Sequence, residues 1–318
     1  MKKLLICSIG SIGRKYIRTI TEFYKDIEIG VYRTGLGLNY KELSLAKKIF
    51  SNIQESIKWL PDYAIICSPA NLHLSQAIIL AEQNIPLLIE KPLCTSSFCE
   101  KEIKELKYLA QKNTILIGYV LRHEKGFSFI KELLRKKEIG NLVRAYSEYG
   151  SWLPDWRSVS NYKESVSSNN KLGGGVLMEL SHEIDLMNGF FGPSKLIGSS
   201  FSSSNTFNID VEDNASILLK TKDNLNLVIQ IDFCTKPPTR NLIIKGTEGL
   251  IKWDLIKKEI NLSTIKNSKV EINKFNVETN SFKNQLDHFF KCSKDKSNPL
   301  VTFEDGFRVI ELIKEIKE

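Results

Sequence analysis

The sequence predicts an α/β protein of two domains, on three observations. Its 318 residues exceed the size of most single hydrophobic cores. From residue 3 to about 118, short apolar runs alternate with segments of helical periodicity, a pattern typical of parallel βαβ units. After Gly118 the pattern changes, and residues from about 195 to 273 consist of successive strand-like runs separated by turn signals, which indicates a meander-like sheet.

The first part is expected to hold a parallel sheet covered by helices. Its apolar runs are continuous, as they are in strands buried on both faces. In chain order we expect a strand Lys3–Ser8, a helix to Lys25, a strand Ile27–Tyr32, a helix near Tyr40–Phe50, a strand Tyr63–Cys67, a helix Leu72–Gln83, a strand Pro86–Ile89, a helix Glu100–Lys112 and a strand Thr114–Gly118.

The second part mixes helices with strands. A helix at Val176–Phe190 has an apolar face, and the final segments return to helical periodicity. In chain order we expect a helix Gly126–Lys137, a strand Leu142–Gly150, a loop Ser151–Lys171, the helix Val176–Phe190, strands that include Ala215–Lys220, Leu225–Phe233 and Asn241–Gly246, and helices Ser281–Cys292 and Phe303–Lys317.

Composition excludes several classes of protein. The net charge of +8 comes mostly from dispersed lysines rather than from one surface stripe of basic and aromatic residues, so we expect no nucleic-acid partner. The positive charge can still favour an anionic substrate. No stretch reaches the roughly 18 to 20 apolar residues that cross a bilayer, and no signal peptide is seen, so we expect no membrane partner and a cytoplasmic location. The six cysteines have no ligand spacing, so neither a metal site nor a disulfide is expected.

A glycine-containing turn joins the first expected strand to the first expected helix. Its sequence is Ser8-Ile9-Gly10-Ser11-Ile12-Gly13, a G-x-G-x-x-G dinucleotide fingerprint with serine in place of the first glycine. Gly10 can let the backbone approach a pyrophosphate, Gly13 allows close packing, and the helix start offers free N–H groups. We therefore predict a cofactor site at Ser8, Gly10, Ser11, Ile12 and Gly13; alternatively, the glycines serve only the turn.

The end of the second strand bears on cofactor choice. An acidic residue that holds the adenosine ribose normally stands there, whereas this chain continues from Tyr32 into Arg33-Thr34. Because an arginine can pair with a 2′-phosphate, we expect NADP(H) to be favoured and NAD(H) to be possible. The alternative is that Arg33 is a solvated turn residue.

Two charged residues, Glu90 and Lys91, follow the apolar run Leu87–Ile89. The carboxyl ends of strands are where ligands bind in open α/β sheets, and a partly desolvated lysine can donate to a substrate oxygen or transfer its proton. Pro92 fixes the turn after them. The alternative is that the two charges form a surface ion pair.

A triple glycine, residues 173–175, precedes the helix that carries Glu179, His182 and Asp185. Their spacing of three places them in one polar stripe. A histidine with carboxylates one turn away on each side has its tautomer set and its basicity raised, which suits a general base. Alternatively, His182 has a structural role, as a lone histidine on a helix more often does.

Five segments, in this order, resemble the Gfo/Idh/MocA family, named after glucose-fructose oxidoreductase and inositol dehydrogenase. They are the glycine turn, Cys67-Ser68-Pro69-Ala70-Asn71-Leu72-His73, Glu90-Lys91-Pro92, Gly118-Tyr119-Val120-Leu121-Arg122, and the helix with His182 and Asp185.

The resemblance implies an N-terminal Rossmann domain with a doubly wound parallel sheet, then an α+β domain with a large, open, mostly antiparallel sheet that builds homodimers or homotetramers. Domain limits of 1–119 and 120–295 are expected, with a C-terminal helix at 296–318 packing back on the body. The resemblance makes Lys91 the active-site lysine and His182 the acid/base. It places Ser68, Pro69, Asn71, His73 and Glu90 near the dinucleotide. The family's Asp four residues before the histidine is absent here, and Glu179 stands three before it, so the role of Glu179 stays open.

The loop Trp152-Leu153-Pro154-Asp155-Trp156-Arg157, with Tyr162 beyond it, resembles a loop in one branch of this family that also has Ser-His-Glu-x-Asp on the next helix. We hypothesise that Trp156 or Tyr162 stacks on a sugar ring while Arg157 and Arg122 hold anionic groups. The alternative is an aromatic plug at the domain junction.

The leading hypothesis is an NAD(P)-dependent enzyme that moves a hydride at a hydroxyl-bearing carbon of a sugar, a sugar acid or a nucleotide sugar, with Lys91 and His182 handling the proton. The first alternative is a cofactor-sensing protein without chemistry. The second is a redox-neutral lyase or hydrolase that oxidises and re-reduces its substrate.

Overall fold

The computed structural model describes residues 1–35, 40–156, 162–266 and 269–318. The chain divides into two compact units, one formed by Met1–Tyr119 with Phe282–Phe307 and the other by Val120–Ser281 with Arg308–Glu318. Each unit holds one sheet. No helix within the described ranges is long and apolar enough to span a bilayer.

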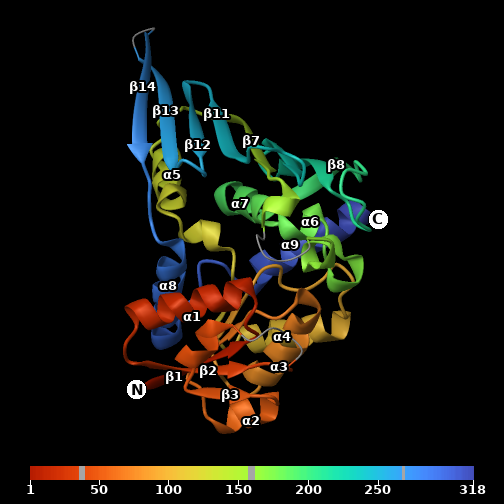
Figure 1. The fold of residues 1–318 in the computed structure, drawn as a ribbon. Coiled ribbons are helices and arrows are strands. Elements are labelled where there is room, and N and C mark those ends of the chain that lie inside the picture. The colour runs from red at the N-terminus through yellow and green to blue at the C-terminus, as the bar shows by residue number, and fades with distance from the viewer. Residues whose placement is uncertain (36–39, 157–161, 267–268) are drawn as a thin grey trace. The chain divides into compact units, whose positions relative to one another are not determined.

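The first unit contains a six-stranded sheet whose pairs are all parallel, in the order β3-β2-β1-β4-β5-β6 (Figure 1). This is a doubly wound sheet, as predicted. Toward their carboxyl ends the central strands are apolar and buried, and polar residues follow where each strand ends. The strands are β1 Lys2–Cys7, β2 Ile27–Tyr32, β3 Lys48–Phe50, β4 Tyr63–Ile66, β5 Leu87–Ile89 and β6 Ile115–Ile117.

Helices from both ends of the chain belong to the first unit. They are α1 Ser11–Phe23, α2 Ile53–Lys58, α3 His73–Ala81, α4 Glu100–Ala110 and α8 Ser281–Asp295, with short 3-10 helices η1 Lys41–Leu45 and η2 Ala70–Leu72. Helix α8 packs on this unit through aromatic contacts, since Phe282 lies 5.2 Å from the Tyr16 ring and Phe289 lies 5.9 Å from the Tyr63 ring. A segment far along the chain therefore completes the core of the first unit.

The expected helix near Tyr40–Phe50 is wrong. The segment forms the short helix η1 and then the edge strand β3, which pairs with β2 through Gly30 and Lys48. The backbone N–H of Lys47 donates to Ile29 at 2.8 Å. Pairing with an available sheet edge gives these backbone groups partners that helical periodicity alone does not reveal.

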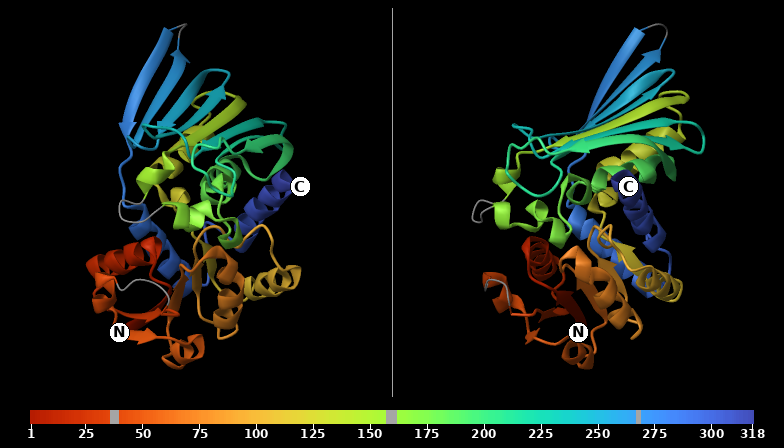
Figure 2. Two further views of the ribbon diagram at one scale, coloured as in Figure 1. Left: turned by 45° about the vertical axis from the view of Figure 1, so that its right-hand side comes forward. Right: turned by 90° about the vertical axis from the view of Figure 1, so that its right-hand side faces the viewer.

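The second unit contains an eight-stranded open sheet in the order β14-β13-β12-β11-β7-β10-β9-β8 (Figure 2). Only β7 and β10 pair in parallel, and the other pairs are antiparallel, so the sheet is mostly antiparallel as expected. The strands are β7 Leu142–Gly150, β8 Ser194–Ser202, β9 Asn214–Thr221, β10 Asn226–Asp232, β11 Thr239–Gly246, β12 Gly249–Asp254, β13 Glu259–Lys266 and β14 Lys269–Asn276.

Helices α5 and α7 pack against one face of this sheet (Figure 1). On β9, Ala215, Ile217 and Leu219 point to the buried face, whereas Leu218 between them is exposed. The helices of this part are α5 Lys125–Arg135, α6 Val176–Glu179, α7 His182–Phe191 and α9 Phe303–Lys317, with 3-10 helices η3 Val120–His123, η4 Leu153–Trp156, η5 Tyr162–Glu164, η6 Val166–Ser168 and η7 Asn170–Leu172.

The single helix expected over Val176–Phe190 is instead two helices, α6 and α7, separated by Leu180 and Ser181. The start of α6 is fixed by Glu212, whose carbonyl accepts from Val176 at 3.0 Å and whose Oε1 accepts from Leu177 at 3.3 Å. These hydrogen bonds anchor the first residues of the short helix α6. Glu179 and His182 consequently do not share one continuous helical stripe.

Two glycines at irregular points of the large sheet allow a matched stability test. A Cβ on Gly246 would lie 2.0 Å from the Ile139 carbonyl oxygen, whereas a Cβ on Gly198 would meet nothing within 4 Å. We expect Gly246→Ala to lower the free energy of unfolding by about 1–3 kcal/mol through overpacking, and Gly198→Ala to change it by less than about 0.5 kcal/mol. Urea unfolding of both variants measures this, and equal losses would contradict it.

Candidate active site

The turn between β1 and α1 has the geometry of a phosphate-binding loop. Gly10 caps α1 in an extended conformation and has open space around its Cβ position, while a Cβ on Gly13 would lie 2.5 Å from the Ser8 carbonyl oxygen. Ser8 replaces the fingerprint's first glycine and has φ +78°, a conformation that side-chain-bearing residues seldom adopt. Ser11 and Ile12 lie in the first turn of α1 beside Gly13.

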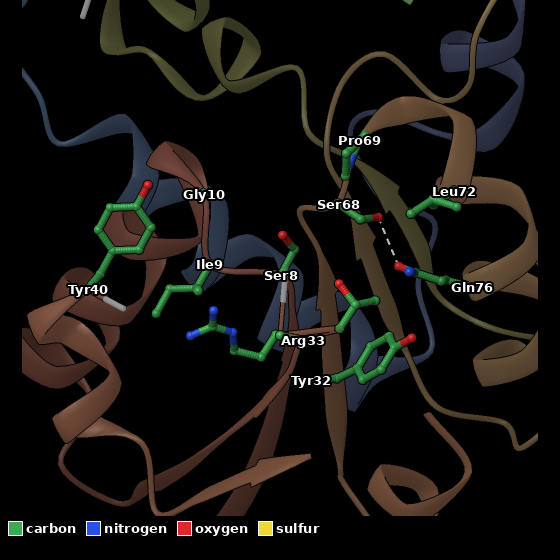
Figure 3. A pocket seen from close by; sticks show the side chains of 12 residues that line it. Ser8, Ile9, Gly10, Tyr32, Arg33, Tyr40, Ser68, Pro69, Leu72 and Gln76 are labelled. Carbon is green, nitrogen blue, oxygen red and sulfur yellow. Dashed lines mark hydrogen bonds between the residues drawn. The ribbon is translucent and has the colours of Figure 1, made fainter. Parts of the chain in front are cut away.

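A pocket of about 200 Å³ opens at the carboxyl edge of the parallel sheet. Ile9, Arg33 and Tyr40 lie on one side of it, and Pro69 and Gln76 on the other (Figure 3). The lining residues are Ser8, Ile9, Gly10, Tyr32, Arg33, Thr34, Gly35, Tyr40, Ser68, Pro69, Leu72 and Gln76. Six of the predicted cofactor residues therefore meet here, from the ends of three strands.

Arg33 and Thr34 follow β2 and line this pocket, so the end of β2 offers a cation and a hydroxyl where a carboxylate was sought. Nearby, the Arg14 guanidinium lies 4.1 Å from the centre of the Tyr40 ring. This cation–π contact holds one wall of the pocket against α1.

The Glu90 carboxyl at the end of β5 is buried, with 7% of the residue exposed. The Tyr16 hydroxyl donates to Glu90 Oε1 at 2.6 Å, and the amide group of Gln285 lies 2.8 Å from the same hydroxyl. The Gln285 atom at this distance is Oε1, an acceptor, so the single hydroxyl proton of Tyr16 lies between two acceptors, of which Glu90 is the nearer.

Burial raises the pKa of Glu90, and the hydrogen bond from Tyr16 opposes that rise. Burial likewise raises the pKa of the neighbouring Cys67 thiol, which marks the same apolar surroundings. Glu90 is thus a buried carboxyl that keeps its proton to a higher pH than usual, rather than half of a surface pair.

Lys91 is half-buried, and its backbone N–H donates to Glu90 Oε2 at 3.2 Å. His73, which is 1% exposed, holds the turn that follows Lys91. The His73 ring nitrogens lie 2.7 Å from the Ser68 carbonyl oxygen and 2.9 Å from that of Pro92. Burial lowers the pKa of His73. His73 therefore links the end of β4 to the turn that follows Lys91.

Two predicted cofactor residues, Asn71 and His73, are separated by one residue and differ in environment. Asn71, in η2, is exposed, whereas His73 is enclosed. Neither belongs to the lining of the pocket, and the same holds for Glu90 and Lys91.

In the second unit, His182 is the first residue of α7 and is half-buried, while Glu179 ends α6. Asp185 is fully buried, and its carboxylate accepts from Arg122 Nε at 3.0 Å and Nη2 at 2.6 Å. Arg122 is itself buried. The structure therefore places Arg122 against Asp185, in a bidentate ion pair that joins η3 to α7.

The aromatic residues of the predicted substrate loop pack against phenylalanines of the same unit. Trp156 Nε1 donates to Ser151 Oγ at 2.9 Å, and its ring lies 5.1 Å from that of Phe233. The Tyr162 ring lies 6.0 Å from that of Phe207. Arg157 lies outside the described residues.

Sequence reasoning missed the buried polar partners of the site, chiefly Tyr16 and Gln285 around Glu90. Both are fully buried, and each lies on the apolar face of its helix. A polar residue inside an otherwise apolar helical face was the available signal, because such a group needs an internal partner.

Two family models match the chain. Residues 2–119 match the NAD-binding Rossmann fold of an oxidoreductase family, and residues 131–318 match the C-terminal alpha/beta domain of the same family. Together these matches take in nearly the whole chain. The chain belongs to the Gfo/Idh/MocA oxidoreductase family. The resemblance seen in the sequence is confirmed, and the pocket lies in the family's NAD-binding domain.

Curated relatives match this chain at low sequence identity over long segments. A 2,7-anhydro-N-acetylneuraminate hydratase of Mediterraneibacter gnavus is 24% identical over 197 residues, 60% of this chain and 50% of the relative. An inositol 2-dehydrogenase of Salmonella typhimurium is 21% identical over 235 residues, 71% of this chain and 66% of the relative. The chain thus matches between half and two thirds of these relatives' lengths.

Solved structures agree on the Gfo/Idh/MocA fold. A levoglucosan dehydrogenase in complex with NADH and levoglucosan has a TM-score of 0.85 at 15% identity, covering 99% of this chain and 95% of that one. A UDP-N-acetylglucosamine 3-dehydrogenase from Acidithiobacillus ferrooxidans has a TM-score of 0.78 at 14% identity, covering 99% and 96%. At these identities the likeness shows the fold.

The Glu90 network predicts a pH-dependent effect of Tyr16→Phe. Because the pKa of folded Glu90 is raised, stability falls as the pH rises from about 4.5, where the unfolded carboxyl loses its proton. Removing the Tyr16 donor raises that pKa further, so we expect a loss of about 1 kcal/mol at pH 4 and a larger loss at pH 7.5.

Urea unfolding at the two pH values measures this difference. Tyr24→Phe is the matched control, because the Tyr24 hydroxyl donates to Asp287 at 2.7 Å in an exposed position. We expect a small loss that is equal at both pH values for this control. A pH-independent loss for Tyr16→Phe would show that Glu90 does not respond as described.

Proposed function

We propose that this protein is an NAD(P)-dependent oxidoreductase that transfers a hydride to or from a hydroxyl-bearing carbon of a sugar, a sugar acid or a nucleotide sugar. One observation carries the proposal. Lys91 follows β5 at the same edge of the parallel sheet as the Ser8–Gly13 turn and the pocket beside it. A proton-transferring group next to a dinucleotide loop is what hydride transfer at a hydroxyl requires.

The cofactor would be held by the Ser8–Gly13 turn, by Ser68 and Pro69 across the pocket, and by Arg33 and Thr34. Free N–H groups at the start of α1 suit a pyrophosphate. Open space at Gly10 leaves room for its close approach. The nicotinamide supplies the hydride acceptor or donor when bound. Arg33 supports a preference for NADP, because a guanidinium binds a 2′-phosphate through two parallel hydrogen bonds.

The proton is assigned to Lys91 and His182. In the oxidative direction the substrate C–H bond yields the hydride, the hydroxyl proton passes to His182, and a carbonyl forms whose oxygen accepts from Lys91. Glu90 would set the position of Lys91 through its hydrogen-bonded chain. Asp185 would act through the backbone of α7, since its carboxylate is engaged by Arg122. Glu179 would contact the substrate from the end of α6.

Several relatives support a polyhydroxylated substrate, because their names specify inositol, levoglucosan and UDP-N-acetylglucosamine. In this chain, Trp156 and Tyr162 would present ring edges or faces to such a molecule. Arg157 and Arg122 would serve an anionic group, Arg122 while paired with Asp185.

We also propose that the large sheet forms a homodimer or homotetramer. Its strands expose apolar side chains, among them Ile197 on β8, Leu218 on β9, and Val270 and Ile272 on β14. Large apolar side chains exposed near both edges of the sheet are available for contacts with further copies of the chain.

A redox-neutral enzyme is the second candidate, favoured by the match to a 2,7-anhydro-N-acetylneuraminate hydratase. Such an enzyme would oxidise a sugar carbon, eliminate or add water, and return the hydride. It would use the same cofactor loop, Lys91 and His182. Substrate conversion without net change in cofactor absorbance distinguishes it from a dehydrogenase.

A substrate screen with active-site variants tests the function. Nucleotide sugars, sugar acids and cyclitols are offered with NADP⁺ or NAD⁺, and absorbance and product are both followed. We expect Lys91→Ala and His182→Asn each to lower kcat by roughly 10²–10⁴-fold, while cofactor binding, followed by fluorescence, persists. Lys101→Ala, on the exposed face of α4, is the control. Full activity in both variants would exclude the proposed roles.

Cofactor preference is tested at Arg33. If it binds the 2′-phosphate, Arg33→Ala should raise KM for NADP by roughly 10–100-fold and leave KM for NAD nearly unchanged, because one charged hydrogen-bonding group is lost. Lys48→Ala on β3, an exposed lysine outside the pocket lining, controls for general loss of positive charge. A wild-type protein that prefers NAD would refute the assignment.

A further inference from the structure

The residue that follows His182 is an enclosed carboxylate. Glu183 is fully buried, and its Oε1 accepts from Arg240 Nε at 2.9 Å and Nη2 at 2.6 Å. Its other oxygen accepts from the Ser147 hydroxyl. The partners of the carboxylate therefore come from β7 and β11, which are neighbours in the middle of the large sheet.

Arg240 is itself held in place. Its guanidinium lies over the Tyr149 ring at 4.3 Å, and Tyr149 stands directly opposite Arg240 in the pairing of β7 with β11. Ser147 is two residues before Tyr149 on the same strand and so faces the same side of the sheet. The Glu183 carboxylate is thus bound by side chains whose positions are set by two paired strands in the middle of the sheet.

Helical geometry relates the hydrogen bonds of Glu183 to the orientation of His182. Successive side chains of an α-helix point about 100° apart around the axis. Glu183 therefore points about 100° to one side of His182, and Asp185, three residues on, points about 60° to the other side. Because Arg240 holds Glu183 and Arg122 holds Asp185, the rotation of α7 about its axis is fixed on both sides of the histidine.

We propose that Glu183, Arg240 and Ser147 are positioning residues for His182. The inference rests on the proposed function, in which His182 exchanges the hydroxyl proton. A buried ion pair adds little net stability over apolar side chains of the same volume. We therefore expect this pair to fix the orientation of α7, and with it that of His182. Misplacing a reacting group by about 1 Å can cost roughly 100-fold in rate.

The decisive experiment compares Glu183→Leu, Arg240→Met and the double variant. Each single variant leaves one charge uncompensated, either the fully buried Glu183 carboxylate or the Arg240 guanidinium, whose side chain is 16% exposed, so both the melting temperature and kcat should fall. The double variant removes both charges, so its melting temperature should return close to that of the wild type. Its kcat should stay roughly 10–100-fold low, with KM for the cofactor within about twofold of wild type.

A purely structural role predicts a different outcome, in which kcat recovers together with the melting temperature in the double variant, and this result would overturn the proposal. The matched control is Glu132→Leu with Arg135→Met, an exposed ion pair of 2.7 Å on α5 that should leave kcat unchanged. If the double variant does not fold, Ser147→Ala, which removes one hydrogen bond, must still lower kcat without changing cofactor KM; an unchanged kcat overturns the proposal.

A readout without substrate separates this inference from the proposed function. The chain has four histidines, so the ring proton signals of His182 can be assigned in NMR spectra by loss of a signal in His182→Asn. We expect the double variant to shift the His182 signal and to leave those of His73, His123 and His288 in place. An unmoved His182 signal refutes the positioning role, whereas absence of any dehydrogenase activity refutes only the proposed function.

Discussion

All six strands of the parallel sheet point the same way, so every strand ends at one edge, and the chemistry of the first unit depends on that constraint. The central strands are apolar and buried toward this edge, and polar residues follow them there. Ser8 follows β1, Arg33 follows β2, Ser68 follows β4 and Glu90 follows β5. Residues far apart in sequence meet because strand direction, rather than any particular side chain, brings them together.

The periodicity of the sequence was sufficient to predict this sheet, because continuous apolar runs between helical segments have few other solutions. It was not sufficient at Lys48–Phe50, where three residues form an edge strand through pairing with β2. The first error comes from tertiary hydrogen bonds, which local patterns do not contain. Periodicity was also insufficient at Leu180 and Ser181, where the helix predicted as continuous is interrupted between α6 and α7.

The sequence selected several residues of the candidate site but did not indicate which side chains bind each other. Asp185 and Arg122 were both selected from the sequence, one for His182 and one for an anionic group, yet their side chains bind each other across 63 positions. Arg240 reaches Glu183 across 57 positions and was not selected at all. Buried charges require partners, but the identity of each partner follows from how strands and helices pack, which spacing along the chain cannot give.

Glu90 in the first unit and the two carboxylates close to His182 in the second unit have different partners, and the difference has a chemical consequence. Glu90 accepts from a neutral donor, the Tyr16 hydroxyl, and burial raises its pKa, so its charge depends on pH. Glu183 and Asp185 are met by arginines, which stay charged at every physiological pH. The carboxyl beside Lys91 therefore loses its proton at a higher pH than an ordinary glutamate does. A pH response that arises from supporting residues of the first unit should then involve both Glu90, whose pKa burial raises, and His73, whose pKa burial lowers.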